Sequence, residues 1–258
     1  MSSSQINGLW VEDSGTGNET VLCIHGLGGS SNFWSPVMPA FGDWRVIRPD
    51  LAGSGRSTEH LSSLSIESHV ASLIGVLDAL GIDQVHVVAH SMGTIIAQHL
   101  AVAHPDRVRS LALFGPLAAP ADAAREPTRN RAMQARTGNA ALQEIADAIC
   151  KAATSVETKT ERPIAVALVR ESIMRQSAEG YALNCEALAE AHAAEVEQLV
   201  IPVLLVTGDE DAVGTPTGTL VLAQRLVDRR HFILQGCGHW TTYEKPFECI
   251  RILMDFYK

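Results

Sequence analysis

Short apolar runs alternate with longer amphipathic runs along most of the chain. The short runs are rich in Val, Ile and Leu, and their length is typical of strands. They cover residues 21–24, 44–47, 85–89, 110–114, 203–207 and 231–234. Because these runs are apolar at nearly every position, they predict a parallel sheet that is covered on both faces.

Helical periodicity separates several of these runs. Between the second and third runs, apolar residues recur at spacings of three and four and predict one helix. They are Ile66, Val70, Leu73, Ile74, Leu77 and Leu80. Gly81 follows as the expected C-cap. A second helix is expected from Met92 to about Ala103, closed by Pro105. Such strand–helix alternation requires right-handed crossovers and predicts an α/β fold.

Residues 118–198 interrupt this alternation. The segment holds no convincing strand, and its helical stretches are rich in Ala, Glu, Arg and Gln. Two narrow apolar faces are expected, formed by Leu142, Ile145, Ala146 and Ile149, and by Ile164, Ala167 and Leu168. Loops of this length are uncommon in compact domains. We therefore expect a cap of three or four helices over 118–198, inserted in a core of residues 1–117 and 199–258. The alternative is a pair of ordinary crossover helices with long loops.

The composition and charge of the chain limit which classes of binding partner are expected. The 258 residues are 46% hydrophobic and 19% charged, which is typical of a globular chain. A formal net charge of −9 provides no basic surface for nucleic acid or an anionic membrane. The sequence shows neither a secretory signal nor a spanning segment, so a cytoplasmic location is expected. The five cysteines are scattered without a C-x-x-C pair, which favours free thiols over disulfides or a zinc site.

The segment VHVVAHSMG, residues 85–93, carries the sharpest chemical signal. An apolar strand ends at Ala89, Ser91 follows, and a helix begins at once, with Gly93 in its first turn. A serine between small residues at this junction is typical of a nucleophile elbow, because the tight turn leaves no space for larger side chains. The first small residue is alanine where glycine is more usual, and its methyl group is accommodated with slight crowding. Ser91 is the predicted nucleophile.

A glycine-rich segment follows the first of the apolar runs. In HGLGGS, residues 25–30, the glycines allow backbone N–H groups to face a ligand. The amides of Leu27 and Met92 are the expected oxyanion hole for Ser91. A plain glycine-rich turn is the alternative interpretation of this segment.

Two later segments provide an acid and a base. Asp209, Glu210 and Asp211 come directly after the apolar run at 203–207, although a solvated acidic loop is the alternative. His239 lies in GCGHW just past the last apolar run. The order serine, acid, histidine along the chain is that of one particular fold.

Together these segments resemble the α/β-hydrolase fold, and within it the small cofactor-free esterases and lactonases, including 3-oxoadipate enol-lactonases. The resemblance covers nearly the whole chain: HGLGGS, DLAGSGRS, AHSMG, GDEDAVGTP, GCGHW and, less specifically, GYALNCEALAE. It implies a mostly parallel central sheet with helices on both faces, whose first antiparallel strand is missing or abbreviated here. It also implies that Asp211 is the acid, that Asp209 and Glu210 have no catalytic position, and that Asp50, Gly53 and Ser57 hold a turn.

The expected activity is that of a serine hydrolase of carboxylic esters or lactones with small to medium acyl groups. Ser91 attacks the carbonyl, His239 takes its proton, and Asp211 orients the imidazole. No metal or cofactor is needed. His90 is expected to line the site and His25 to hold the oxyanion loop.

Two alternatives keep the same fold. One is a receptor for a small hormone-like molecule that retains an intact triad and turns over slowly. The other is an enzyme that uses the pocket for carbon–carbon bond hydrolysis or cofactor-free perhydrolysis. Fold-level analogy does not separate them, and the sequence carries no signal for an oligomeric state.

Overall fold

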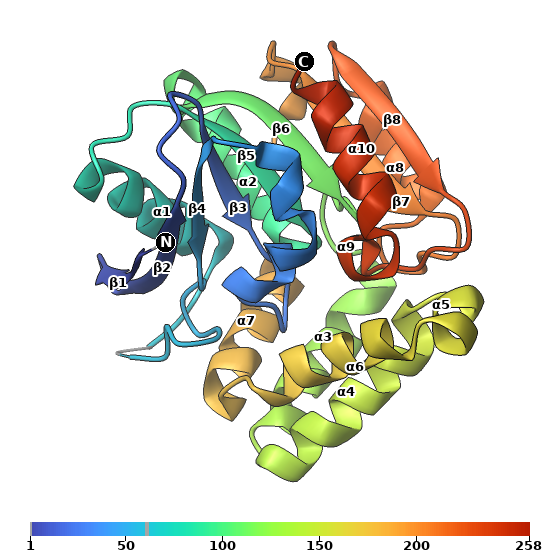
Figure 1. Ribbon diagram of the computed structural model, residues 1–258. Coiled ribbons are helices and arrows are strands. Elements are labelled where there is room, and N and C mark those ends of the chain that lie inside the picture. Colours follow the sequence, from blue (N-terminus) through green and yellow to red (C-terminus); the bar gives the residue numbers. More distant parts are fainter. Residues whose placement is uncertain (1, 60–61) are drawn as a thin grey trace.

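The computed structural model describes residues 2–59 and 62–258, and an eight-stranded sheet runs through its centre (Figure 1). The strand order is β1-β2-β4-β3-β5-β6-β7-β8. The strands are β1 Ser2–Ile6, β2 Leu9–Ser14, β3 Thr20–Ile24, β4 Arg45–Pro49, β5 Val85–His90, β6 Val108–Phe114, β7 Val203–Gly208 and β8 Arg229–Leu234. All pairs from β4 to β8 are parallel. The six predicted strands and the mostly parallel α/β-hydrolase sheet are confirmed.

The N-terminal edge of the sheet differs from the prediction. The chain forms two antiparallel strands there, β1 and β2, and β2 pairs antiparallel with β4. The expectation that the first antiparallel strand is missing or abbreviated was therefore wrong. The strand β1 has the sequence SSSQI and is exposed along almost its whole length, so no apolar pattern marks it. Its backbone forms hydrogen bonds with β2, and such bonds require no pattern of hydrophobic residues.

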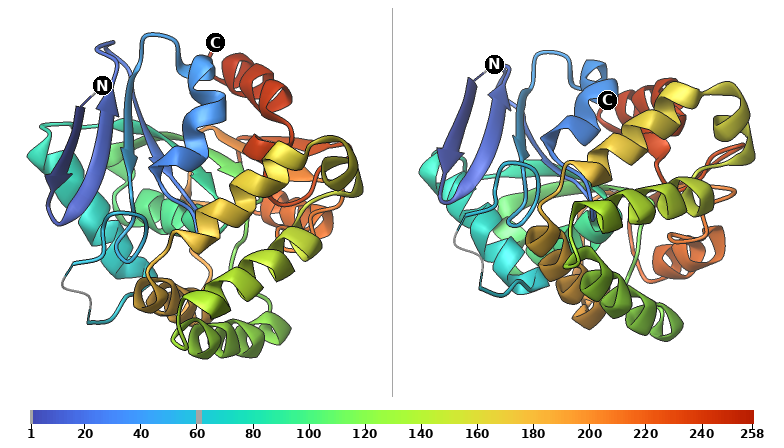
Figure 2. Two further views of the ribbon diagram at one scale, coloured as in Figure 1. Left: turned by 60° about the horizontal axis from the view of Figure 1, so that its bottom comes forward. Right: turned by 90° about the horizontal axis from the view of Figure 1, so that it is seen from below.

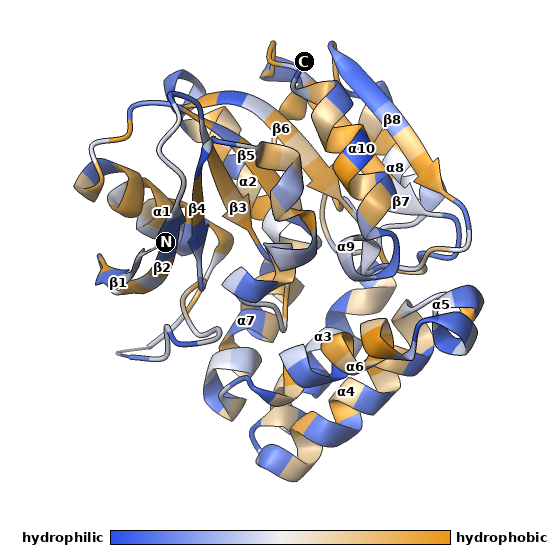
Figure 3. Cartoon of the chain, in the orientation of Figure 1, coloured by the Kyte–Doolittle hydropathy of each residue, from blue (hydrophilic) through white to orange (hydrophobic). Residues whose placement is uncertain are grey.

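Helices cover both faces of the sheet. On one face lie α1 Ile66–Ala79, α2 Met92–Ala103 and α8 Pro216–Gln224. On the other face lie η1 Ser31–Phe41 and α10 Pro246–Phe256. Successive strand residues belong to opposite cores, as Leu22 and Cys23 do in β3. Because both faces are buried, the central strands are apolar at nearly every position, and β3 is mostly orange in Figure 3.

Five helices occupy the segment between β6 and β7. They are α3 Asp122–Ala135, α4 Asn139–Ala153, α5 Val156–Glu161, α6 Pro163–Met174 and α7 Ala178–Glu190. They lie together beyond the edge at which the parallel strands end (Figures 1 and 2). Three or four helices were expected; α5 was not predicted because its six residues are too few to show a periodic stripe. We keep the term cap for residues 118–198, whose limits as a separate domain remain a prediction.

The buried face of α6 also differs from the prediction. Ile164 is 77% exposed and Leu168 42% exposed, whereas Ala165, Val169 and Ile173 are buried. Both sets are apolar and share helical spacing, so periodicity alone does not decide which set faces inward. The packing of α6 against α4 and the glycine-rich loop turns the second set inward.

The short elements are η2 Pro105–Arg107, η3 Val196–Gln198 and α9 Thr241–Glu244. All five cysteines are buried with free thiols. Within the two described ranges, the longest apolar helix still falls short of what crossing a membrane requires.

Candidate active site

Ser91 occupies a strained turn between β5 and α2. Its backbone has φ 52° and ψ −123°, a region that non-glycine residues seldom adopt. The Ser91 amide donates to the carbonyl of Phe114 at 3.0 Å, and the Thr94 hydroxyl donates to the Ser91 carbonyl at 2.7 Å. These bonds hold the turn in place, as a nucleophile elbow requires.

The turn leaves no space for a side chain at two neighbouring glycines. A Cβ atom on Gly93 would lie 2.5 Å from the His25 carbonyl oxygen, and one on Gly26 would lie 2.8 Å from Cβ of Ser91. Both distances are shorter than any real carbon contact. The small residue expected after the serine is therefore required by backbone that passes directly beside it.

The structure brings Ser91, His239 and Asp211 together at the carboxyl edge of the sheet. The Ser91 hydroxyl donates to Nε2 of His239 at 2.8 Å, and Nδ1 of His239 donates to Oδ2 of Asp211 at 2.9 Å. These residues follow β5, β8 and β7, and each is less than a tenth exposed. In this arrangement the imidazole, oriented by the carboxylate, can activate the hydroxyl as a nucleophile.

Asp211 is held as a carboxylate. Its Oδ1 accepts hydrogen bonds from the amides of Val213 and Gly214, both at 2.8 Å, and leaves Oδ2 to His239. Burial alone would raise the pKa of Asp211, but the interaction with His239 and the two amides together hold it below its ordinary value. Asp211 is therefore ionised at neutral pH and favours the tautomer that carries a proton on Nδ1 of His239.

The two neighbouring acids contact other groups. Asp209 accepts a hydrogen bond from the Cys237 amide at 3.1 Å, and Glu210 accepts one from the Val156 amide at 2.9 Å. Both acids are exposed. Asp209 fastens the segment just before His239, and Glu210 fastens the start of α5 in the cap.

The two residues whose amides are expected to form an oxyanion hole, Leu27 and Met92, lie near Ser91. Met92 is the first residue of α2, so its amide has no acceptor within the helix. Leu27 lines the same cavity as Ser91. Behind it, the Gly28 carbonyl accepts hydrogen bonds from Ser172 at 2.7 Å and Gln176 at 3.2 Å. These bonds fasten the glycine-rich loop to α6 and to the residue Gln176 that follows it. The oxyanion role remains a prediction.

The two histidines near the site have different positions. His25 donates from Nδ1 to the Gly26 carbonyl at 2.8 Å and accepts at Nε2 from the Leu51 amide at 3.0 Å, so it does hold the oxyanion loop. His90 was expected to line the site and instead packs behind it. Its ring stacks on Phe33 at 4.3 Å, and its Nε2 donates to the His239 carbonyl at 2.9 Å. Burial, together with the neighbouring His239, lowers the pKa of His90 to about 3.

Asp50, Gly53 and Ser57, which were expected to hold a turn, form one loop after β4. Asp50 accepts hydrogen bonds from the Ser31 amide at 2.7 Å and from Arg56 at 2.8 Å. Ser57 donates to the Asp50 carbonyl at 2.7 Å, and Gly53 has a φ of 77° that suits glycine. These contacts fix the loop after β4 against the start of η1.

A cavity of about 440 Å³ opens over Ser91 and His239 between the sheet edge and the cap. This volume lies within the usual range for small-molecule sites. Part of the wall is apolar, formed by Leu27, Ile145, Ala148, Ile149, Ala152, Leu188 and Trp240. Arg131, Gln134, Glu144 and Tyr181 add polar groups.

Sequence reasoning missed Arg131 and Tyr181. Helix α3 carries several arginines, and Arg125, Arg129 and Arg136 each pair with a carboxylate. Arg131 has no such partner among the described residues. Tyr181 is 1% exposed, and its hydroxyl has no hydrogen-bond partner within the described part of the chain. Only the docking of α3 and α7 over the serine distinguishes these two residues from ordinary surface and core positions.

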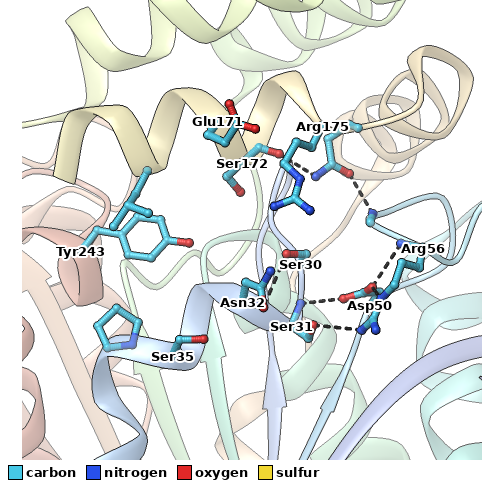
Figure 4. A pocket seen from close by; sticks show the side chains of 14 residues that line it. Ser30, Ser31, Asn32, Ser35, Asp50, Arg56, Glu171, Ser172, Arg175 and Tyr243 are labelled. Atoms are coloured by element: carbon cyan, nitrogen blue, oxygen red, sulfur yellow. Dashed lines mark hydrogen bonds and ion pairs between the residues drawn. The ribbon is translucent and has the colours of Figure 1, made fainter. Parts of the chain in front are cut away.

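Two further features lie apart from the triad. Glu67, His99 and His192 bring potential metal-ligand atoms within 4.8 Å of one another on the outer side of α1 and α2, where they could hold a divalent cation. A second cavity of about 370 Å³ lies between η1 and α6, and Arg175 reaches into it from α6 (Figure 4). Its lining includes no residue of the triad.

Comparison with known proteins supports the fold. The carbamate hydrolase RutD of Caulobacter segnis is 38% identical over 117 residues, which is 43% of this chain and 44% of that protein, so the match spans less than half of that relative. The 2-hydroxy-6-oxononadienedioate/2-hydroxy-6-oxononatrienedioate hydrolase 1 of Dechloromonas aromatica is 26% identical, over 96% of this chain and 90% of that one. The enol-lactonase from Burkholderia xenovorans LB400 superposes with a TM-score of 0.90 at 27% identity, covering 99% of each chain. A family model for the alpha/beta hydrolase fold matches residues 19–246, and the chain belongs to this family.

Proposed function

We propose that this protein is a serine hydrolase of carboxylic esters or lactones that works through an acyl-enzyme. The observation that carries the proposal is the continuous hydrogen-bonded chain from Ser91 through His239 to Asp211, at 2.8 and 2.9 Å. A serine hydroxyl in this setting is a nucleophile for acyl carbonyl carbons. The similarity to an enol-lactonase over nearly the whole chain supports the same reaction class.

Each group has one task in the proposed reaction. His239 accepts the Ser91 proton as the hydroxyl attacks, and later activates the water that releases the acyl group. Asp211 keeps the imidazole in the required tautomer and stabilises its cationic form. The Leu27 and Met92 amides donate to the oxyanion that develops on the carbonyl oxygen.

The cavity favours compact substrates. Its volume of about 440 Å³ and its roof of cap helices suit small to medium acyl groups or lactones. An apolar wall gains about 0.8 kcal/mol per buried CH₂ only while space remains. Long acyl chains therefore lose this gain once the cavity is full.

The polar residues of the cavity favour a substrate that carries its own carboxylate. The Arg131 guanidinium lines the cavity and can donate two parallel hydrogen bonds to such a group. The relative from Dechloromonas aromatica is named for a dioate substrate, which is consistent with this preference.

A second candidate is carbon–carbon bond hydrolysis in the same cavity. It is supported by the match to that same relative, which covers 96% of this chain. The two candidates differ in the bond that is cleaved and share the serine, the histidine and the carboxylate-binding groups.

Ser91→Ala should abolish ester turnover while the protein stays folded, because the hydroxyl is the proposed nucleophile. The expected loss in kcat is about 10⁴–10⁶-fold. The measurement is hydrolysis of p-nitrophenyl butyrate at substrate excess, with circular dichroism of the variant as the control for folding. A folded variant that kept most of its activity would contradict the assignment, and a wild type with only one turnover per site would favour a receptor.

Asp211→Asn should be far more damaging than Asp209→Asn or Glu210→Gln. Only Asp211 contacts His239, and asparagine favours the wrong tautomer, so a loss in kcat of about 10⁴-fold is expected. The other two changes keep an acceptor oxygen and only weaken a hydrogen bond to the Cys237 or Val156 amide, so they should leave the rate nearly unchanged. Steady-state kinetics of the three variants on one ester, beside their melting temperatures, checks this order. Equal losses of kcat at Asp209 and Asp211 would show that the acid is misassigned.

Activity should peak at short or medium acyl chains. A series of p-nitrophenyl esters from acetate to palmitate, compared by kcat/KM, tests the size of the cavity directly. Palmitate should be among the poorest substrates, because its chain exceeds the space over Ser91. A maximum at palmitate, or activity that rises only above the micelle threshold, would contradict a closed pocket.

Arg131→Met should weaken selection for a carboxylate. The paired substrates are p-nitrophenyl hydrogen glutarate and p-nitrophenyl pentanoate, which have acyl chains of equal length and differ in a terminal carboxylate. We expect kcat/KM for the glutarate ester to fall about 10–100-fold, since a charged hydrogen bond contributes about 1.5–3 kcal/mol. The pentanoate ester should change less than about twofold.

Arg129→Met is the matched control, because Arg129 lies on the same helix and pairs with Glu190 at the surface. It should leave both substrates unaffected. Equal losses on both esters in Arg131→Met would indicate a structural role for Arg131 and not recognition of a carboxylate.

A further inference from the structure

Glu244 is a fully buried carboxylate close to the proposed base. It ends the short helix α9, and its exposed fraction is 0%. Its Oε2 accepts a hydrogen bond from the Gly238 amide at 2.9 Å, and its Oε1 accepts one from the Trp240 amide at 3.0 Å. These are the amides on the two sides of His239. One carboxylate therefore closes the turn that carries the histidine.

The same carboxylate binds the cap. Its Oε2 also accepts from the Ser155 amide and the Thr158 hydroxyl, both at 2.8 Å, at the start of α5. A further bond joins the two parts nearby, because the His239 amide donates to the Ala153 carbonyl at 2.9 Å. The junction between α4 and α5 is thus fastened to the His239 turn from both directions.

This arrangement fits a positioning device better than simple filling of space. A buried carboxylate is costly unless hydrogen-bond donors replace its water. Four donors surround Glu244, and no lysine or arginine side chain forms an ion pair with it among the described residues. The nearest pair is between Lys245 and Glu157. A buried network in which every donor and acceptor has a partner is rigid, and it fixes the positions of the groups that it binds.

We propose that Glu244 is a positioning residue that sets the place of His239 and couples it to the cap. The proposal rests on the proposed function, in which His239 is the base. Ala153 lines the cavity, and its carbonyl holds the His239 amide. A substrate that packs against this end of α4 therefore presses on the segment that holds the histidine, so cap contacts act on the rate as well as on binding.

Glu244→Gln tests the proposal because glutamine has nearly the same shape and keeps only one acceptor oxygen. Its NH₂ group must face backbone N–H donors, so at least one of the two amides beside His239 or the cap contact is lost. We expect kcat to fall about 10–100-fold, the size of effect that a small misplacement produces, with KM changed by less than about threefold. The rate at which a fluorophosphonate probe labels Ser91 should fall in parallel.

Glu157→Gln is the matched control. Glu157 lies at the same boundary between cap and core and pairs with Lys245 at 2.6 Å, without contacting the amides beside His239. It should leave kcat and the labelling rate within about twofold of the wild type. Thr158→Val removes one of the two donors that the cap gives to Glu244 and leaves the Ser155 amide in place, so it should lower kcat about three- to tenfold at constant KM. This variant also serves if Glu244→Gln does not fold.

A spectroscopic readout separates this proposal from the proposed function. The proton that His239 donates to Asp211 should give a downfield ¹H NMR resonance, which should broaden or disappear in Glu244→Gln and persist in Glu157→Gln. If the wild type shows the resonance but neither labelling nor turnover, the proposed function fails while the resonance still tests the positioning. A folded Glu244→Gln protein with an unchanged resonance and wild-type kcat would overturn the role of Glu244, even if its melting temperature fell.

Discussion

The strained backbone of Ser91 is the constraint on which the rest of the site depends. A φ of 52° at a serine costs roughly 1–3 kcal/mol, and it persists only where the surroundings enforce it. Strands β3 and β5 pair directly beneath it, with Ile24 opposite Ala89. This pairing places the loop after β3 against the serine so closely that Gly26 and Gly93 have no space for a Cβ atom. Glycines in two separate motifs are thus required by one turn, and the residue after Gly26, Leu27, lines the cavity with the serine.

The parallel sheet brings the loops that carry Asp211 and His239 to the same edge as Ser91. In a parallel sheet, all carboxyl ends meet at one edge, and the loops after β5, β7 and β8 meet there. Gly208 lies opposite Leu234, and a Cβ atom on Gly208 would lie 2.0 Å from the Cys237 carbonyl oxygen. The two loops therefore touch through backbone. The amide of Glu210 donates to that same carbonyl at 2.9 Å, so the acids without a catalytic position still fix the distance between Asp211 and His239.

Elements whose sequence signal lies within a few neighbouring positions could be predicted, whereas elements that depend on distant contacts could not. The central strands, α1, α2 and the elbow at Ser91 are marked by periodicity or by small residues within a few positions, and the structure has them where expected. The strand β1 was not predicted because it is exposed and depends on its backbone pairing with β2. Arg131 and Glu244 escaped for a different reason. Each is a charged residue in a polar stretch, and only the docking of the cap places one over the serine and buries the other among four donors.

The cap holds two parts of the proposed machinery through different helices. Ser172 of α6 and Gln176, which follows that helix, bind the carbonyls of the expected oxyanion loop, while the junction of α4 and α5 binds the His239 turn. The proposed carboxylate-binding group, Arg131, is instead on α3, which packs against α7. Charge recognition and support of the reacting groups are therefore on separate helices. Substitutions on the cavity side of α3 can change which substrate is preferred while leaving Ser91 and His239 in place, whereas substitutions at the α4–α5 junction act on the reaction itself.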